Sequence, residues 1–376
     1  MIMNIQGALQ YSGLYLIIFF LSLLFNAFHT MDKRKKRNYL IISLTPLMLM
    51  SMFRAEHVGN DTWNYIELYK MVAANDFSYI QNSITEKGYL LYDYIIFRYF
   101  NHYQFIFIIS SFFIYSSIYF FLMKYIQAPG AFMCIFIGMN MFDFFLSTQR
   151  QGIAIAILIY AIDAAFEKKL FKFLIFVAVA FLFHYSSIVF LFIYPLVNTR
   201  IQKQSIKVIV VAVTALLLLF FNRILSLLLI AFPKYRYYEG GALFDGEPRL
   251  AIVLKISVYM LLLIVTNMYV NMEDKNKQDC IQGSSQYKFF NTLALINICL
   301  FAVSSQATAL ARFCSLFNIY PISNYSNALG RVERKSRMIL SILTGVAFYI
   351  YGLVIILLKT PTWITTYPFE FVKSLK

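Results

Sequence analysis

The chain has 376 residues, of which 60% are hydrophobic and only 14% are charged, and its mean hydropathy is +0.66. Soluble domains are about 45–50% apolar and about 25% charged, so this composition excludes an ordinary soluble domain and predicts an all-α integral membrane protein. The net charge of +15 does not predict a nucleic-acid partner, because the basic residues cluster in short loops between apolar segments, as positive-inside topology requires.

Apolar stretches that approach the length needed to cross a hydrocarbon layer of roughly 30 Å recur along the whole sequence. They predict a single polytopic membrane domain over residues 1–376, built as a bundle of about 10–12 transmembrane helices. The expected spans are 9–28, 39–53, 105–123, 130–147, 149–166, 170–183, 186–197, 208–230, 250–270, 288–304, 309–321 and 338–358.

Four loops between these spans are rich in Lys and Arg, and we expect all four on the cytoplasmic side. They are "DKRKKR" (32–37), "EKKLFK" (167–172), "RIQKQSIK" (200–207) and "RVERKSR" (331–337). This arrangement requires 170–197 to form a helical hairpin and puts both chain termini outside. The long loops 54–104 and 231–249 then also lie outside, where we expect both to contribute to a site. The end of the first, "EKGYLLYDYIIFRYF", suits a helix lying at the membrane interface.

Charged residues at the outer ends of spans are costly in a membrane and often mark a site. In "FRAEHVGNDTWNY" (53–65), Arg54 directly follows an apolar span. It is either a snorkelling arginine at a helix end or part of a site. Asp61 either caps a short helix that starts in "NDT" or takes part in the same site, and the two roles are compatible.

In "STQRQGIAIAI" (147–157), Arg150 opens an apolar span on the side where basic residues are scarce. An arginine at a helix N-terminus adds its charge to free backbone N–H groups, and this combination favours an anion such as phosphate. The alternative is an ion pair with Asp143, seven residues earlier in the chain.

His184 in "FLFHYSS" (181–187) lies at the expected outer tip of the 170–197 hairpin. It is either a structural histidine satisfied by Ser186 and Ser187, or a general acid or base. Arg312 in "TALARFCSLFNIYP" (308–321) is a second cation in an apolar outer segment. Its alternative role is an ion pair inside the bundle.

The sequence contains no HExxH, GxSxG, DxD or Walker motif, so metal-hydrolase, serine-hydrolase, nucleotide-sugar and ATPase functions lose support. The four cysteines form no CxxC pair, and they are expected to be small buried hydrophobes. We therefore expect no metal site and no cofactor.

The order and spacing of several short motifs resemble the EpsG family of Wzy-type polymerases, over about residues 10 to 370. In chain order these motifs are "FR…GNDTWNY", "EKGYLLYDYII", "RQGIAIAI", "KKLFKFLIFVAVAFLFHYSSIVFL", "KYRYY", "ARFCSLFNIYP" and the closing "TTYPFEF". The positions that match the family are Arg54, Gly59, Asp61, Glu86, Arg150, Gln151, His184, Arg236 and Arg312.

The resemblance implies a GT-C-like, metal-independent glycosyltransferase that acts on the outer face of the bacterial cytoplasmic membrane. Donor and acceptor would both be oligosaccharides on undecaprenyl diphosphate, as in the synthesis of O-antigen, capsule or exopolysaccharide. A chain-length regulator and a flippase would be its further partners, beside membrane lipid.

The resemblance also suggests roles for these residues. Arg150 and Arg312 would bind the diphosphate, and Arg54 would hold the other lipid. His184 or Asp61 would be the catalytic base. Glu86, Gln151 and Arg236 would be further substrate contacts.

Three other functions remain open from the sequence. A ligase that moves finished polymer from the same lipid carrier would need the same arginines and an outer histidine. A polysaccharide flippase is less favoured, because that class predicts related halves and charges near the membrane midplane. An inactive membrane component of a synthase complex is the third.

Overall fold

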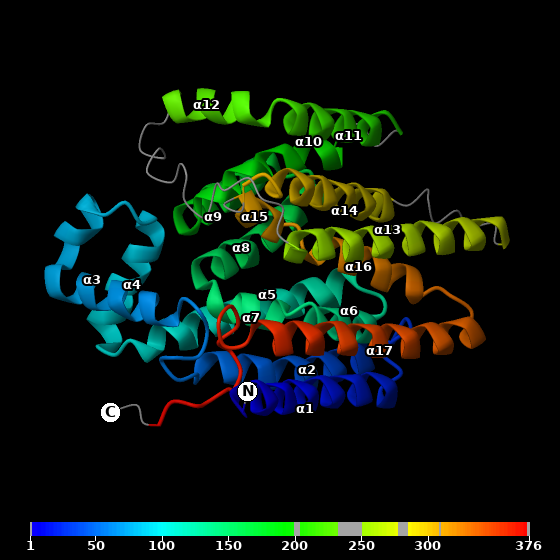
Figure 1. Cartoon of the computed structure of the whole chain (residues 1–376), viewed down its shortest axis with the longest axis horizontal. Coiled ribbons are helices and arrows are strands. Elements are labelled where there is room, and N and C mark those ends of the chain that lie inside the picture. The colour runs from blue at the N-terminus through cyan, green and yellow to red at the C-terminus, as the bar shows by residue number, and fades with distance from the viewer. Residues whose placement is uncertain (1, 199–203, 232–249, 277–284, 308–309, 374–376) are drawn as a thin grey trace. The chain divides into compact units, whose positions relative to one another are not determined.

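The computed structural model describes the chain except for residues 1, 199–203, 232–249, 277–284, 308–309 and 374–376 (Figure 1). In the described part, the chain is all-α, and its β-structure is limited to an isolated bridge between Arg54 and Phe371. The elements are α1 (Ile2–Leu24), α2 (Lys33–Met52), α3 (Thr62–Asn82), α4 (Lys87–Phe100), α5 (Gln104–Tyr125), α6 (Pro129–Gly138), α7 (Met141–Ser147), α8 (Gln149–Phe166), α9 (Leu170–Phe183), the 3-10 helix η1 (Tyr185–Phe192), α10 (Ile193–Asn198), α11 (Gln204–Leu219), α12 (Phe221–Ala231), α13 (Leu250–Asn276), α14 (Ser285–Ser304), α15 (Ala311–Ser315), α16 (Ile319–Leu329) and α17 (Arg334–Lys359).

A polytopic helical membrane protein is confirmed, but fewer helices have the length of a span than the sequence predicts. In the described residues, five helices are long and apolar enough to cross a membrane, or up to seven if two bent helix pairs each count as one span. One of these pairs replaces the expected span 130–147, where α6 and α7 meet at 65° and Asn140 adopts a left-handed conformation between them. The expected spans 170–183 and 186–197 are likewise short, being α9 and the pair of η1 and α10.

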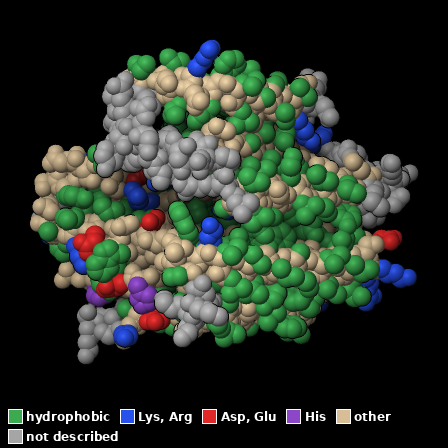
Figure 2. Space-filling view, in the orientation of Figure 1, with side chains coloured by type: hydrophobic (Ala, Val, Ile, Leu, Met, Phe, Trp, Pro, Cys, Tyr) green, Lys and Arg blue, Asp and Glu red, His purple; other side chains and the backbone are tan. Residues whose placement is uncertain are grey.

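The chain divides into two compact units, which are described separately here. Unit 1 comprises Met1–Leu191 and Leu329–Lys376, and unit 2 comprises Phe192–Ala328. In unit 1, α2 packs on α5, α5 on α8, and α8 on α9, while α17 packs on α1 and α6. The exposed side chains of α17 are largely apolar, as expected where a helix meets lipid, and hydrophobic side chains gather toward the lower right of Figure 2. The prediction of one domain over the whole chain stays a prediction.

Three of the four basic loops lie at one common end of unit 1. Lys36, at the start of α2, donates a 2.9 Å hydrogen bond to the carbonyl of Met123 near the end of α5. Arg331, just before α17, donates to the side chain of Gln127, at 3.0 Å. The third loop, 167–172, follows α8, whose Asp163 contacts the end of α5. The fourth, 200–207, lies partly outside the described residues.

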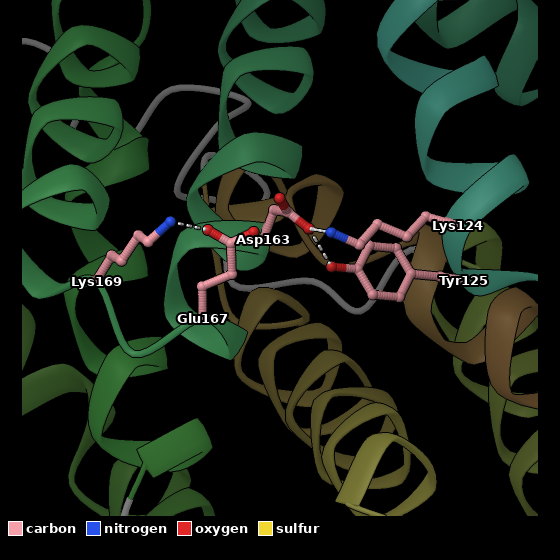
Figure 3. Close-up of polar contacts among 5 residues, drawn as sticks. All are labelled: Lys124, Tyr125, Asp163, Glu167 and Lys169. Carbon is pink, nitrogen blue, oxygen red and sulfur yellow. Dashed lines mark hydrogen bonds and ion pairs between the residues drawn. The ribbon is translucent and has the colours of Figure 1, made fainter.

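Ion pairs close this basic end of unit 1 (Figure 3). Asp163 on α8 accepts hydrogen bonds from Lys124 and Tyr125 at the end of α5, the second at 2.6 Å. Glu167, just past α8, pairs with Lys169 at 2.9 Å. The contacts of Asp163 join the end of α5 to the end of α8. The pair of Glu167 and Lys169 lies in the turn between α8 and α9. Helices α5 and α8 therefore run parallel, with their other ends also adjacent.

The opposite end of unit 1 is built by the loop 54–61 and the segment 360–372, which follows α17. The backbone N–H of Ala55 donates to Glu370 at 3.0 Å, and that of Val372 donates to Phe53 at 2.8 Å. Asn60 donates to the carbonyl of Trp363 at 2.6 Å and accepts from Thr365 at 2.8 Å. The predicted motif "GND" thus connects the loop 54–61 to the segment 360–372 by hydrogen bonds.

The expected outer loop 54–104 is largely helical, because α3 and α4 pack together as a hairpin (Figure 1). Val72, Ile80 and Leu90 are buried at its centre. Asp93 on α4 is also fully buried, and neither of its carboxylate oxygens has a hydrogen-bond partner among the described residues. Burial raises the pKa of Asp93 well above its usual range, although the charge of Arg150 opposes the shift.

Gly59 adopts φ +93°, and a Cβ there would lie 2.4 Å from Leu146 Cδ2. We therefore predict that Gly59→Ala destabilises the protein by about 1–3 kcal/mol from backbone strain alone, with the clash adding to it. Gly13→Ala is the matched control, because a Cβ at Gly13 meets nothing within 4 Å. Thermal unfolding in detergent should show a lower midpoint for the first variant only, and equal midpoints would contradict the prediction.

The buried carboxyl group of Asp93 gives a second prediction, on the pH dependence of stability. Because its folded-state pKa is raised, its contribution to stability is full below the unfolded value of about 4 and is lost as the pH rises toward the folded-state pKa. Asp93→Asn should remove this slope and raise the unfolding midpoint at pH 7. Asp32→Asn, at an exposed helix N-cap, controls for loss of one negative charge, and an unchanged slope in Asp93→Asn would refute the prediction.

Candidate functional site

Three ionisable side chains from three different helices meet in unit 1. Glu86 is the N-cap residue of α4, Arg150 lies in the first turn of α8, and His184 is the C-cap residue of α9. Arg150 Nη1 lies 2.5 Å from Glu86 Oε2, and His184 Nδ1 lies 3.3 Å from Glu86 Oε1. We call these three residues the Glu86 cluster.

A close approach between α4 and α9 allows this contact. Gly88 lies two residues after Glu86, and a Cβ at this position would stand 2.8 Å from the carbonyl oxygen of Leu182. Only glycine therefore lets the first turn of α4 touch the last turn of α9. Since α8 packs along α9 and begins at the same end, Arg150 reaches the same carboxylate from the other side.

Glu86 is held as a carboxylate. Burial raises its pKa, but the close contact with His184 and the charge of Arg150 outweigh burial and lower the pKa to about 2. The side chains of Glu86 and His184 are 8% and 12% exposed, whereas that of Arg150 is 31% exposed. The cluster thus combines an enclosed carboxylate with one cation that reaches the surface.

The cluster keeps unused hydrogen-bonding groups. Arg150 Nε and both ring nitrogens of His184 are buried and have no hydrogen-bond partner within the described ranges, and the same holds for the hydroxyls of Ser186 and Ser187. His184 is therefore not satisfied by these two serines, its ionisable neighbour is Glu86, and its role as an acid or base stays a prediction. Buried polar groups without partners are rare, and they often mark a place where a ligand or water binds.

Arg150 does form an ion pair, but with Glu86 and not with Asp143. Asp143 instead accepts hydrogen bonds from Thr366 and, at 3.5 Å, from Ser147. The sequence offered an ion pair as the alternative role of Arg150, and the ion pair exists, but its partner is Glu86. Glu86 is 64 positions from Arg150 in the chain. Helical periodicity relates only residues within the same helix, so it could not predict this pair.

Arg54 is buried, with 2% of the residue exposed, so the snorkelling alternative is wrong. Its guanidinium lies over the Phe107 ring at 3.9 Å and donates to Ser51 at 2.8 Å and to Thr62 at 3.2 Å. Burial lowers the pKa of Arg54 to about 10, which leaves it charged at neutral pH. It ties the end of α2 to the start of α3, and its role as a lipid ligand stays a prediction.

Asp61 occupies the N-cap position of α3, as the capping alternative predicts, but its side chain makes no capping hydrogen bond. Gln151 is buried in the first turn of α8. Arg312 is exposed on α15 in unit 2, and Arg236 lies outside the described residues. In the described ranges, no group of three or more His, Cys, Asp or Glu side chains could hold a metal ion.

Further residues lie beside the cluster, and of these Gln149 was not singled out from the sequence. Gln149 donates to the carbonyl of Ile106 and to Ser110, both at 2.7 Å, and accepts from Tyr89 at 3.5 Å. Its signal was its place directly before Arg150. The Tyr65 ring lies 5.9 Å from the Arg150 guanidinium.

The comparisons with known proteins agree with this arrangement of motifs. The family model described as the EpsG family matches residues 37–371, and so covers nearly the whole chain. No curated protein and no solved structure matches. The EpsG family is associated with Wzy-type polymerases, which are glycosyltransferases of polysaccharide biosynthesis. Because the match extends over far more than half of its length, this multi-pass membrane protein belongs to the EpsG family.

Proposed function

We propose that this protein polymerises lipid-linked oligosaccharide repeat units of O-antigen, capsule or exopolysaccharide. It transfers the oligosaccharide of one undecaprenyl diphosphate carrier onto the repeat unit of another. The Glu86 cluster is the observation that carries the proposal, because it brings a cation and an imidazole together within the family's matched region. This is the pair of groups that such a transfer requires.

Arg150 is the group that meets the leaving diphosphate. As the bond between the sugar and the diphosphate breaks, its electron pair leaves with the diphosphate, whose negative charge grows. A guanidinium stabilises this charge because its planar fork binds phosphate oxygens bidentately and stays protonated. Glu86 contacts Nη1, while Nε has no partner in the described part and is available to a phosphate oxygen.

His184 is the group that takes the proton from the acceptor hydroxyl. Glu86 faces Nδ1 at 3.3 Å, while Nε2 has no partner in the described part. A carboxylate behind an imidazole fixes its orientation and stabilises the imidazolium that forms. The acceptor oxygen then bonds to the sugar carbon, and its proton moves to His184. Glu86 is accordingly a positioning residue, since a carboxylate repels the diphosphate for which the sequence suggested it.

The remaining matched residues keep supporting roles in this proposal. Asp61 is the alternative base, and Gln151 contacts substrate beside Arg150. Arg312 and Arg236 stay candidate ligands of a lipid diphosphate. Arg54 supports the site through the loop that it braces and is a candidate ligand of the other lipid.

The proposed orientation follows from the two ends of unit 1. The end with Lys36, Lys124 and Arg331 carries the basic loops, and basic loops favour the cytoplasm. The Glu86 cluster belongs to the other end, where the loop 54–61 and α4 begin. The proposed site therefore opens on the outer face of the bacterial cytoplasmic membrane, where a flippase delivers the lipid-linked units and a chain-length regulator acts.

The first test is the polymer formed by cells or by the purified protein with synthetic lipid-linked repeat units. Arg150→Ala and His184→Ala should each lower polymerisation at least about 100-fold, since charge stabilisation and general base catalysis each contribute on that order. Arg98→Ala, at an exposed arginine in the last turn of α4, should retain the full ladder.

Protein levels in the membrane have to match in all three variants. A normal ladder from Arg150→Ala and His184→Ala would refute the proposed site. A ladder that forms but is no longer attached to its final acceptor would favour a ligase instead.

The second test uses the pH dependence of the Glu86 contacts. Because the folded-state pKa of Glu86 is lowered to about 2, its stabilising contribution is full above the unfolded pKa of about 4.3 and is lost as the pH falls toward 2. The unfolding midpoint of the wild type should exceed that of Glu86→Gln at pH 7, and the difference should shrink between pH 4.5 and pH 3.

Glu86→Gln should also lower kcat about 100-fold with little change in KM, because it misorients the base and leaves diphosphate binding intact. A midpoint difference that stays constant down to pH 3 would show that the carboxylate is not held by these cations. A raised KM with unchanged kcat would argue for the substrate-binding role instead.

A further inference from the structure

Unit 1 has an apolar groove of about 610 Å3 bordered by α4, α5, α8 and α9. Its lining includes Ile109 and Phe113 from α5, Ile153 and Ile157 from α8, and Val179 and Phe183 from α9. This volume lies within the range of about 300–1,000 Å3 that is typical of ligand pockets.

The few polar groups in the lining are already engaged within the protein. The hydroxyls of Tyr92 and Ser110 both donate to the carbonyl of Ile106, each at 2.6 Å. The Tyr160 hydroxyl is in contact with Ser117 at 3.3 Å. An occupant of the groove therefore meets hydrocarbon and aromatic rings, and a polar ligand would gain no partner there.

Two helices that border the groove also carry members of the Glu86 cluster. Ile153 and Ile157 follow Arg150 by three and seven positions on α8, so they share its helix face and lie about 4.5 Å and about 10 Å further along the axis. On α9, Phe183 immediately precedes His184. The apolar lining thus starts one helical turn from the proposed catalytic groups.

The groove also borders a side of the protein that can meet lipid. Ile175 and Val179 line it and are 46% and 37% exposed, respectively. A chain can therefore enter it from the bilayer without crossing the polar site.

We propose that this groove binds the isoprenoid chain of a diphosphate-linked lipid, with the diphosphate at Arg150. The inference rests on the proposed function and adds the route that the lipid takes. A long apolar chain attached to an anion matches a cation followed by hydrocarbon walls. The occupant is an isoprenoid carrier and not a bulk phospholipid, because the reacting bond has to lie between Arg150 and His184 while its own lipid chain leaves along an apolar path.

The test measures binding without any sugar or polymer. Full-length protein in nanodiscs is photolabelled with undecaprenyl diphosphate that carries a benzophenone in its chain, and the labelled peptides are mapped. The label should fall on α5, α8 or α9. Val179→Trp fills the groove from the exposed face of α9 and should lower labelling about tenfold, by removing roughly two buried CH2 groups from contact.

Leu174→Trp is the matched control, because Leu174 is an exposed apolar residue of the same helix outside the lining. It should label like the wild type, and both variants should show unchanged unfolding midpoints. Unlabelled undecaprenyl diphosphate should compete at a concentration at least tenfold lower than phosphatidylglycerol.

Equal labelling of the two tryptophan variants, or equal competition by phosphatidylglycerol, would overturn the inference and indicate ordinary membrane lipid in the groove. The two proposals fail separately. A groove that binds the carrier in a protein that makes no polymer would retain this inference and reject the polymerase. Polymer that depends on Arg150 but not on Val179 would do the reverse.

Discussion

The end of unit 1 opposite its basic loops depends on one carboxylate shared by two basic side chains. Glu86 has little access to water, and a buried charge of this kind is tolerated only when it is paired. Its two partners come from α8 and α9, while Glu86 itself begins α4. The pairing therefore fixes the positions of three helix ends relative to one another.

The same constraint shapes the neighbouring elements. Gly88 has no side chain because α4 must approach Leu182 closely enough for Glu86 to reach His184. Gln149 donates hydrogen bonds to Ile106 and Ser110 in the first turns of α5. These bonds fix the first turn of α8 against α5, and hence the position of Arg150. The basic end of unit 1 contributes from a distance, since the contact of Asp163 with Tyr125 keeps α5 and α8 parallel.

The sequence predicted those features that depend on local composition. Runs of apolar residues predicted a polytopic helical protein. Clusters of Lys and Arg predicted a common side for the basic loops, and three of these loops lie at one end of unit 1. Arg150 and His184 stood out because charge is expensive beside hydrocarbon. These signals need only a residue and its neighbours in the chain, and so they can be read from one sequence.

Features that depend on distant contacts could not be predicted in this way. The partner of Arg150 was expected seven residues away and is Glu86, 64 residues away. Among the described residues, fewer helices have the length of a span than the hydropathy predicts, because hydropathy does not register the break at Asn140 or the shortness of α9. The burial of Arg54 and Asp93 was also missed, because the segment 54–104 was expected to be an outer loop and is largely helical.

The joint between the loop 54–61 and the segment 360–372 bears on how the protein is made. The loop follows the second helix, but its partners follow the last one, so Ala55 and Asn60 can find Glu370 and Trp363 only after α17 has been synthesised. This end of unit 1 therefore gains these hydrogen bonds only in a chain that has been made through to its last helix.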